Sequence, residues 1–283
     1  MDWTPGNMSS DIEDRRDSGG GGGFRAGRLG MMGVVVLIAL GLMIKHQFFG
    51  GRSVQSAQQT RPVAMQSHGA GEDRDAHLIS YVLDDVQQQW TQIFAKQGKQ
   101  YRHAKLVLFR GSTYSGCGTA RAASGPFYCP ADEKVYIDLN FWDALRHYGG
   151  STADFAQAYV IAHELGHHVQ KLMGIEAKVA QLEQRQPGER MHLSVDTELQ
   201  ADCYAGVWAH SAQARGKVHE ADIDSALSAA AAVGDDHLQK MTGRAVSPER
   251  WTHGSAAQRT MWFKRGFTSG DMAQCNTFGG QSN

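Results

Sequence analysis

The sequence predicts an α+β protein, rich in helix, in which a small sheet precedes a helical remainder. Two observations support this class. Residues 105–111 and 133–141 are short and apolar, and the second segment alternates in the manner of a half-buried strand. Longer segments around them place apolar residues at helical spacing, and several end in glycine, which is typical of a helix C-terminus.

The elements follow one another from residue 77. Residues 77–98 form a predicted helix that ends at Gly98. In the second strand segment, Val135, Ile137 and Leu139 lie on one side, and its edge is a candidate for pairing with an extended peptide. The helices expected after the strands cover residues 151–174, with Ser151 and Asp154 as a capping box and Gly174 as C-cap, then 193–216, 220–234, and a last one near 252–267 that Pro248 opens.

The first 75 residues have a different composition. Residues 1–28 are polar and rich in glycine, and we expect a disordered leader. Residues 29–44 carry no charge, and with Phe48 and Phe49 they predict a membrane anchor over residues 29–49. A buried core helix and a cleaved signal peptide are the alternatives. A polar linker over 50–75 then leads to a single domain over 76–283.

Flanking charge sets the expected orientation. Arg15, Arg16, Arg25 and Arg28 precede the predicted anchor, which favours a cytoplasmic N-terminus, although Lys45, Arg52 and Arg61 follow it and make the difference in charge small. The domain would then lie on the periplasmic, extracytoplasmic side of the inner membrane as a single-pass protein. The whole chain has 28 basic and 29 acidic residues, so no basic surface is indicated and nucleic acid is not an expected partner. The oligomeric state is not predicted.

Four cysteines fit an oxidising compartment. Cys117 and Cys129 bracket a loop rich in Gly, Ala and Ser that a disulfide could close, and Cys203 and Cys275 would then be the second pair. Four cysteines allow three pairings, and four buried free thiols are the alternative.

The motif H-E-x-x-H carries the chemistry of the chain. His163 and His167 are four residues apart, so on a helix they face the same way and can hold one metal ion. Glu164 lies beside them, where it can reach a water molecule as general base. His168 points about 100° away from His167, so we expect it on the polar face of the helix.

A third ligand has to come from another element, because Gln170 and Met173 break the metzincin extension of the motif. Glu198 and Asp202 are four residues apart on the next long helix. We expect Glu198 to complete a zinc site and Asp202 to accept the second N–H of a ligand histidine. An ordinary solvated acidic face is the alternative.

Five segments, in this order, resemble the bacterial neutral zinc metallopeptidases, a family of envelope proteins: "GCG", "GPFYCPADEKVYID", "AHELGHHVQ", "ELQADCYAGVWA" and "HGSAAQRTMWFKRGF". The resemblance covers nearly the whole chain. It implies a zincin-like domain of gluzincin type with Zn²⁺, in which His163, His167 and Glu198 match the ligand pattern and Glu164 matches the catalytic glutamate.

The expected activity is zinc-dependent hydrolysis of polypeptide. His253 and Tyr204 are candidate donors to the oxyanion, although either could be a packing or surface residue. Residues 260–267 predict an amphipathic helix with a basic outer face formed by Arg259, Lys264 and Arg265. A non-catalytic zinc-binding scaffold and a zinc amidase acting on cell-wall material are the rival functions.

Overall fold

The computed structural model describes residues 1–17, 70–121, 125–243 and 245–279, and these belong to one folded unit. Within these ranges, no helix is both long enough and apolar enough to cross a membrane. The predicted anchor at residues 29–49 lies outside the described residues.

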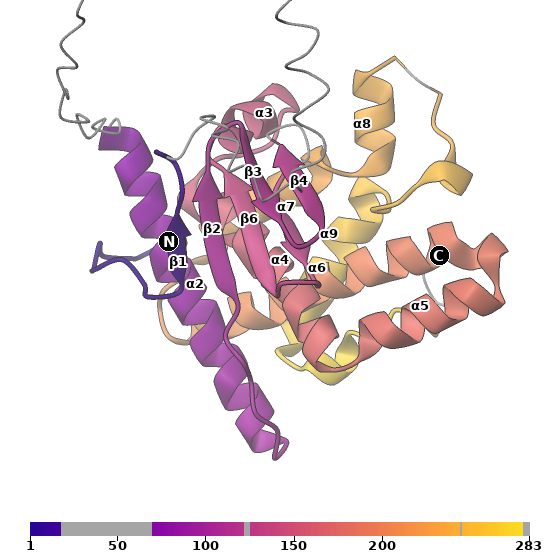
Figure 1. The fold of residues 1–283 in the computed structure, drawn as a ribbon, viewed down its shortest axis with the longest axis horizontal. Coiled ribbons are helices and arrows are strands. Elements are labelled where there is room, and N and C mark those ends of the chain that lie inside the picture. Colours follow the sequence, from indigo (N-terminus) through magenta and orange to yellow (C-terminus); the bar gives the residue numbers. More distant parts are fainter. Residues whose placement is uncertain (18–69, 122–124, 244, 280–283) are drawn as a thin grey trace, which may run out of the picture. The chain divides into compact units, whose positions relative to one another are not determined.

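The domain contains a four-stranded sheet and a separate hairpin (Figure 1). In the sheet, β2 is parallel to both of its neighbours, β1 and β6, and β5 is antiparallel to β6. The strand order is β1 (Ile12–Asp14), β2 (Lys105–Phe109), β6 (Lys134–Asp138) and β5 (Phe127–Cys129), and the hairpin pairs β3 (Ser112–Ser115) with β4 (Gly118–Arg121).

Both predicted strands are confirmed, and they form the centre of the sheet. Val135 and Ile137 point into the main core, as predicted, whereas Tyr136 faces the hairpin with Val107 and Phe109. The prediction that residues 133–141 offer a free edge is wrong, because β6 is paired on both sides. The strand at that end of the sheet is β5.

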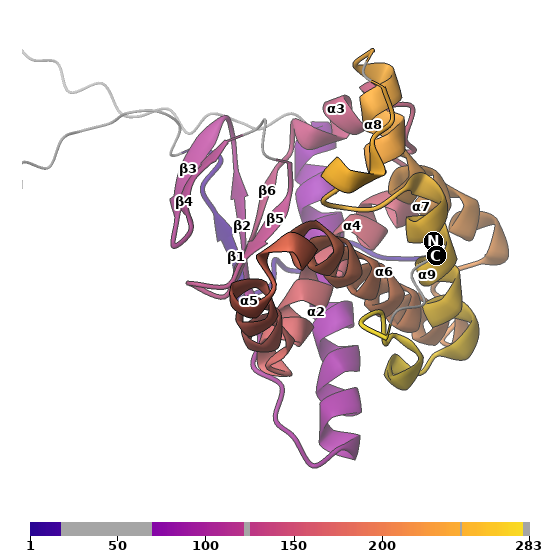
Figure 2. The ribbon, with the colours of Figure 1, turned by 90° about the vertical axis from the view of Figure 1, so that its right-hand side faces the viewer.

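Helices cover one face of the sheet, with α2 and α4 nearest to it and α6 and α9 beyond them (Figure 2). The predicted helices are confirmed as elements, although their ends differ, and α3, α5 and α8 were not predicted. The bounds are α2 (Ala70–Lys96), α3 (Phe141–His147), α4 (Asp154–Leu172), α5 (Ile175–Arg185), α6 (Arg190–Ala214), α7 (Glu220–Ala232), α8 (Asp235–Met241) and α9 (Ala256–Ser269).

Some predicted helix ends are wrong in detail. No side chain caps α4 at its N-cap residue, Ala153. Pro248 begins only a single 3₁₀ turn; α9 begins instead at Ser255, whose hydroxyl accepts a hydrogen bond from the backbone N–H of Gln258. Gly174 is confirmed as the residue that ends α4, in a left-handed conformation with φ of 73°. The predicted linker over 50–75 is too long, since α2 begins at Ala70.

The expectation of a disordered leader is wrong for residues 1–17. These residues belong to the folded unit, where β1 pairs with β2 and Trp3 donates a hydrogen bond to Asp154. Hydrogen bonds and ion pairs, such as those of Asp11 and Glu13, help to hold this polar segment on the domain, so a test of apolar content alone overlooks it. The domain boundary at residue 76 is corrected accordingly.

Two disulfides join the expected cysteines. Cys117, in the turn of the hairpin, is bonded to Cys129 in β5, and Cys203 in α6 is bonded to Cys275. The first bond ties the hairpin to the end of the sheet, and the second ties the C-terminal segment to a central helix.

Close contact between α6 and α9 depends on two glycines. A methyl group on Gly266 would lie 1.9 Å from the carbonyl oxygen of Cys203, and one on Gly206 would lie 2.2 Å from the carbonyl oxygen of Phe263. Backbone meets backbone at both points, so no flexible side chain could move aside. The contact holds the helix that carries Glu198 against the helix that carries Arg259.

We predict that Gly266→Ala destabilises the domain by about 2 kcal/mol or more, because the added methyl group forces the two helices apart. Urea denaturation followed by circular dichroism measures this. Gly71→Ala in α2 is the matched control, since nothing outside the backbone of its own helix lies within 4 Å of the added methyl group, and it should not lower the free energy of unfolding. Equal stability of the two variants would contradict the close contact.

Candidate metal centre

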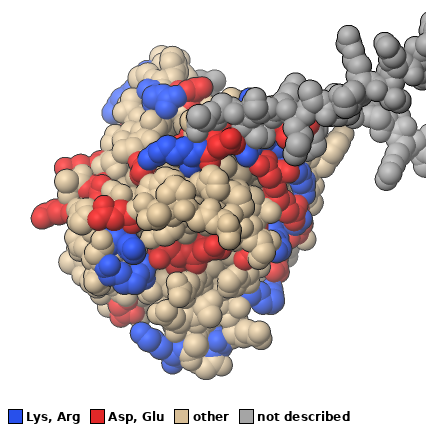
Figure 3. All heavy atoms as spheres, turned by 90° about the vertical axis from the view of Figure 1, so that its left-hand side faces the viewer, with Lys and Arg blue, Asp and Glu red and all other residues tan. Residues whose placement is uncertain are grey.

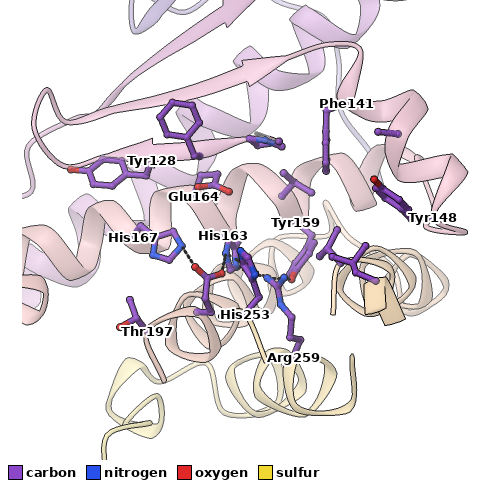
Figure 4. A pocket seen from close by; sticks show the side chains of 18 of the residues that line it. Tyr128, Phe141, Tyr148, Tyr159, His163, Glu164, His167, Thr197, His253 and Arg259 are labelled. Atoms are coloured by element: carbon purple, nitrogen blue, oxygen red, sulfur yellow. Dashed lines mark hydrogen bonds and ion pairs between the residues drawn. The ribbon is translucent and has the colours of Figure 1, made fainter. Parts of the chain in front are cut away.

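Three donor side chains converge between α4 and α6. His163 and His167 lie one turn apart on α4, with perpendicular rings whose centroids are 4.9 Å apart. Glu198, from α6, places one carboxylate oxygen 3.2 Å from Nε2 of His163 and the other 3.5 Å from Nε2 of His167. One donor atom from each residue lies within 4.8 Å of the other two. The structure thus brings the three predicted ligands together (Figure 4).

A second contact sets the tautomer of each imidazole. Nδ1 of His163 lies 2.8 Å from a carboxylate oxygen of Asp202, and Nδ1 of His167 lies 2.8 Å from the amide oxygen of Gln170. The amide of Gln170 is oriented by its own NH₂ group, which donates to the carbonyl oxygen of Thr197 at 2.7 Å. Because an acceptor faces each Nδ1, a proton stays on that nitrogen, so each Nε2 is the atom that would present a lone pair to a metal at the shared centre.

The donor set fits a catalytic zinc ion. Two imidazoles and one carboxylate are a common set of protein ligands in zinc hydrolases, which leave a further position for water or substrate. Among the described residues, the cluster has three members, and none of the four cysteines is free to join it. The residues present therefore suit zinc with an open coordination position.

Asp202 lies behind His163, on the side of the imidazole that faces away from Glu198. Its side chain is fully buried and accepts hydrogen bonds from His163 at 2.8 Å, from the hydroxyl of Tyr159 at 2.5 Å and from two nitrogens of Arg259 at 2.8 and 2.9 Å. Burial alone would raise the pKa of Asp202, but Arg259 and His163 lower it to about 2. Asp202 is therefore ionised at neutral pH and holds its imidazole in one orientation.

The predicted position of Arg259 is wrong. It was expected on a basic outer face, but it is only 3 % exposed and lines the site cavity, whereas Lys264 and Arg265 are exposed as predicted. A signal was present, because Arg259 precedes Trp262 and Phe263 by three and four residues and so shares their buried face. A charge on that face needs a buried partner, and Asp202 provides it.

Glu164 lies beside the two imidazoles and lines the same cavity. It is 7 % exposed, and burial raises the pKa of its carboxyl group, with a smaller contribution of the same sign from Glu198, although the two histidines oppose the shift. A raised pKa brings a carboxylate closer to the range in which a general base works at neutral pH.

His253 lies at the rim of the cavity, on the segment that precedes α9. Asp235 fixes this segment, since one of its carboxylate oxygens accepts the backbone N–H groups of Thr252, His253 and Gly254. The hydrogen bond to Asp235 raises the pKa of the His253 imidazole, and Glu198 adds to the rise. Tyr204, the other candidate, is buried against Trp90 and does not line the cavity, so that expectation is wrong.

His168 is not on a polar face, contrary to expectation. The imidazole is fully buried, with Nε2 2.7 Å from the carbonyl oxygen of Arg102 and Nδ1 3.0 Å from the hydroxyl of Tyr128. The carbonyl can only accept, so Nε2 carries the proton and the tyrosine hydroxyl donates to Nδ1. This link joins α4 to β5 and sets the width of the cavity between them.

The cavity has a volume of about 610 Å³ and lies over the three donors (Figure 4). Its polar part holds the ligand set, Glu164, His253 and Arg259. The remaining wall is largely apolar and includes Phe127, Phe141, Tyr148, Val160, Val233 and Leu238. Space of this size accommodates several side chains of a bound molecule next to the metal position.

We predict that zinc binding to the metal-free protein releases about one proton at pH 7. Burial alone would lower the pKa of His163, but Asp202 and Glu198 raise it to about 10, so without metal a proton occupies the position. The proton on Nε2 of His163 has to leave before this nitrogen can bind zinc. Calorimetry in two buffers of different ionisation enthalpy counts the protons, and the apparent affinity should rise about tenfold per pH unit between about pH 6 and 8. No proton release and a flat profile would contradict this.

Comparison with known proteins identifies the family. The family described as "Putative neutral zinc metallopeptidase" matches residues 1–278. The uncharacterized protein YpfJ of Escherichia coli (strain K12) is 47% identical over 289 residues, covering 99% of each chain. The uncharacterized protein Rv2575 of Mycobacterium tuberculosis (strain H37Rv) is 46% identical over 189 residues, or 63% of each chain. No solved structure matches. The chain therefore belongs to the neutral zinc metallopeptidase family.

Proposed function

We propose that this protein is a zinc endopeptidase that hydrolyses polypeptides, with Glu164 as general base. The observation that carries the proposal is the convergence of His163, His167 and Glu198 within 4.8 Å, next to Glu164, at the base of a large cavity. Zinc held by these three residues would lower the pKa of a water molecule and polarise the carbonyl group of the substrate.

The side chains of the protein would carry the proton transfers. Glu164 takes a proton from the attacking water and later delivers it to the leaving amine nitrogen. Its buried position in the same cavity as the imidazoles supports this role, and its raised pKa suits both accepting and releasing the proton. Asp202 and Gln170 hold the two imidazoles in place throughout, so the ligand geometry need not reorganise during the reaction.

His253 is the best placed donor to the developing oxyanion. It lines the cavity from a segment that Asp235 holds through three backbone N–H groups, and its pKa is raised, which favours the protonated, donating form. Arg259 also lines the cavity, but its hydrogen bonds to Asp202 commit it to support of His163. A histidine at the rim can approach the substrate without breaking a buried network.

An extended peptide suits the shape and chemistry of the cavity. Phe127 and Tyr128 of β5 line it, and among the described strands β5 pairs only with β6. The other side of β5 can therefore accept the backbone of a substrate as an added strand. The apolar wall formed by residues such as Phe141, Tyr148 and Leu238 would receive a large apolar side chain close to the cleaved bond. Muropeptides offer few such side chains, so this wall favours polypeptide over cell-wall material.

The rival function is a zinc-binding scaffold without activity. Such a protein would have no use for Glu164, a carboxylate buried beside the ligands but outside the ligand set. A structural zinc site is also usually closed by four protein ligands, whereas the described cluster has three. Two disulfides support action in an oxidising, extracytoplasmic compartment.

We predict that Glu164→Gln lowers kcat/KM on unfolded casein by about 10²–10⁴-fold, because the general base is lost while the ligands remain. Proteolysis is measured with the zinc-loaded full-length protein, and zinc content is measured in the same samples. Glu183→Gln, on the side of α5 that pairs with Arg190 near the surface, is the matched control and should retain full activity.

Two outcomes would count against the proposal. Equal activity of Glu164→Gln and the parent protein would remove Glu164 from the reaction. Full zinc content without turnover of casein, of apolar-rich peptides or of muropeptides would favour the scaffold, and cleavage of muropeptides alone would favour the amidase.

A further inference from the structure

The N-terminal seventeen residues form an integral part of the domain that carries the metal centre. Strand β1 extends the sheet beyond β2, with Ile12 opposite Leu106 and Asp14 opposite Leu108. The pairing continues at both ends, where the backbone N–H of Leu106 donates to Asp11 and that of Arg15 donates to Leu108. Strand β2 would otherwise be an exposed sheet edge, so β1 covers it.

Side chains make this contact specific. Asp11 accepts hydrogen bonds from Lys105 at 2.7 Å and from Gln87 at 3.1 Å. Glu13 pairs with Lys134 at 2.5 Å, across β2 on the next strand of the sheet. These partners lie about a hundred residues away in the sequence, and each matches an acidic group of the segment with a donor of the domain.

Arg16 anchors the end of the segment. Its side chain is 5 % exposed, and its guanidinium donates three hydrogen bonds to Asp14, the shortest at 2.6 Å, and lies 3.4 Å from Asp73 of α2. Arginine is almost never buried without a partner, so this position is built for the folded segment. In the sequence, Arg16 is one of the basic residues that predict a cytoplasmic N-terminus. In the structure it instead binds Asp14 and Asp73 within the folded unit.

A second contact holds the start of the segment on the other side of α2. The indole N–H of Trp3 donates to Asp154 at 2.7 Å, and the guanidinium of Arg74 lies over the Trp3 ring, 5.3 Å from its centre. Ser9, between the two contacts, hydrogen-bonds to Ser80 and Asp84 on α2. Figure 3 shows the face that carries α2, on which acidic and basic side chains are interspersed.

We propose that residues 1–17 and the metal domain lie on the same side of the membrane, so that the chain does not make a single crossing between them. One crossing between the two segments would place β1 and β2 on opposite sides, where they could not pair. This holds whether β1 comes from the same molecule or from a second copy.

The two disulfides indicate which side is shared. Cys117–Cys129 and Cys203–Cys275 lie in the same unit as β1, and such bonds persist in oxidising compartments. We therefore expect the N-terminal segment and the metal centre together outside the cytoplasm. This inference does not depend on the proposed activity.

Cysteine labelling of the full chain in bacterial spheroplasts tests the shared side. Met8→Cys marks the N-terminal segment and Tyr114→Cys marks the hairpin; the two parent side chains are 37 % and 82 % exposed. A membrane-impermeant maleimide should label both variants before lysis. If neither variant is labelled until the cells are lysed, the two segments still lie on the same side of the membrane, but that side is the cytoplasm. Labelling of Tyr114→Cys before lysis and of Met8→Cys only afterwards would overturn the proposal.

A second measurement tests the packing itself. Arg16→Ala should lower the thermal midpoint of the purified full-length protein by at least about 5 °C, because it removes the ion pairs that the buried guanidinium makes with Asp14 and Asp73. Arg121→Ala, at an exposed position on β4, is the matched control and should shift the midpoint little. Equal midpoints for the two variants would show that the segment does not pack on the domain, and would overturn the proposal as well.

Discussion

Close packing of α4 against α6 is the constraint on which the site depends. A methyl group on Gly166 would lie 3.1 Å from the backbone of Ala201, so the two helices approach at the limit that glycine and alanine permit. Gly166 lies between the two histidines of the motif, and Ala201 lies one turn after Glu198. The distance between these backbones is therefore what brings a carboxylate from one helix to two imidazoles on the other. A larger residue at either position would push the two helices apart at the level of the ligands.

Buried charged side chains behind the ligands hold the His163 imidazole in its orientation. Asp202 receives hydrogen bonds from His163, Tyr159 and Arg259, all within the buried region between α4, α6 and α9. A buried carboxylate with one partner would be costly, whereas one with several donors is satisfied. Arg259 also balances the charge of Asp202, so that the imidazole is oriented without a large excess of negative charge beside the metal. This arrangement explains why α9 has to pack closely on α6 through Gly206 and Gly266.

Local spacing explains what could be predicted. His163 and His167 are four residues apart, and so are Glu198 and Asp202. Residues with this separation lie on the same face of a helix, so each pair could be assigned to one face from the sequence. In the same way, the alternation of apolar and other residues over 133–141 was sufficient to predict strand β6. The partners of Arg259 and His168 could not be predicted with confidence from spacing, because they come from elements far away in the sequence. The packing of the N-terminal segment on the domain was not predicted for a related reason. In the sequence alone its acidic groups resemble solvated charges, because Lys105 and Lys134, which bind them, belong to distant strands.

X-ray absorption at the zinc K edge of the zinc-loaded, full-length protein tests the central claim most directly. The account predicts two imidazole nitrogens and otherwise oxygen ligands, at about 2.0–2.2 Å, with at least one oxygen that exchanges with an added small inhibitor such as a hydroxamate. A third imidazole, a sulfur ligand near about 2.3 Å, or a closed set of four protein ligands that the inhibitor cannot change would contradict it.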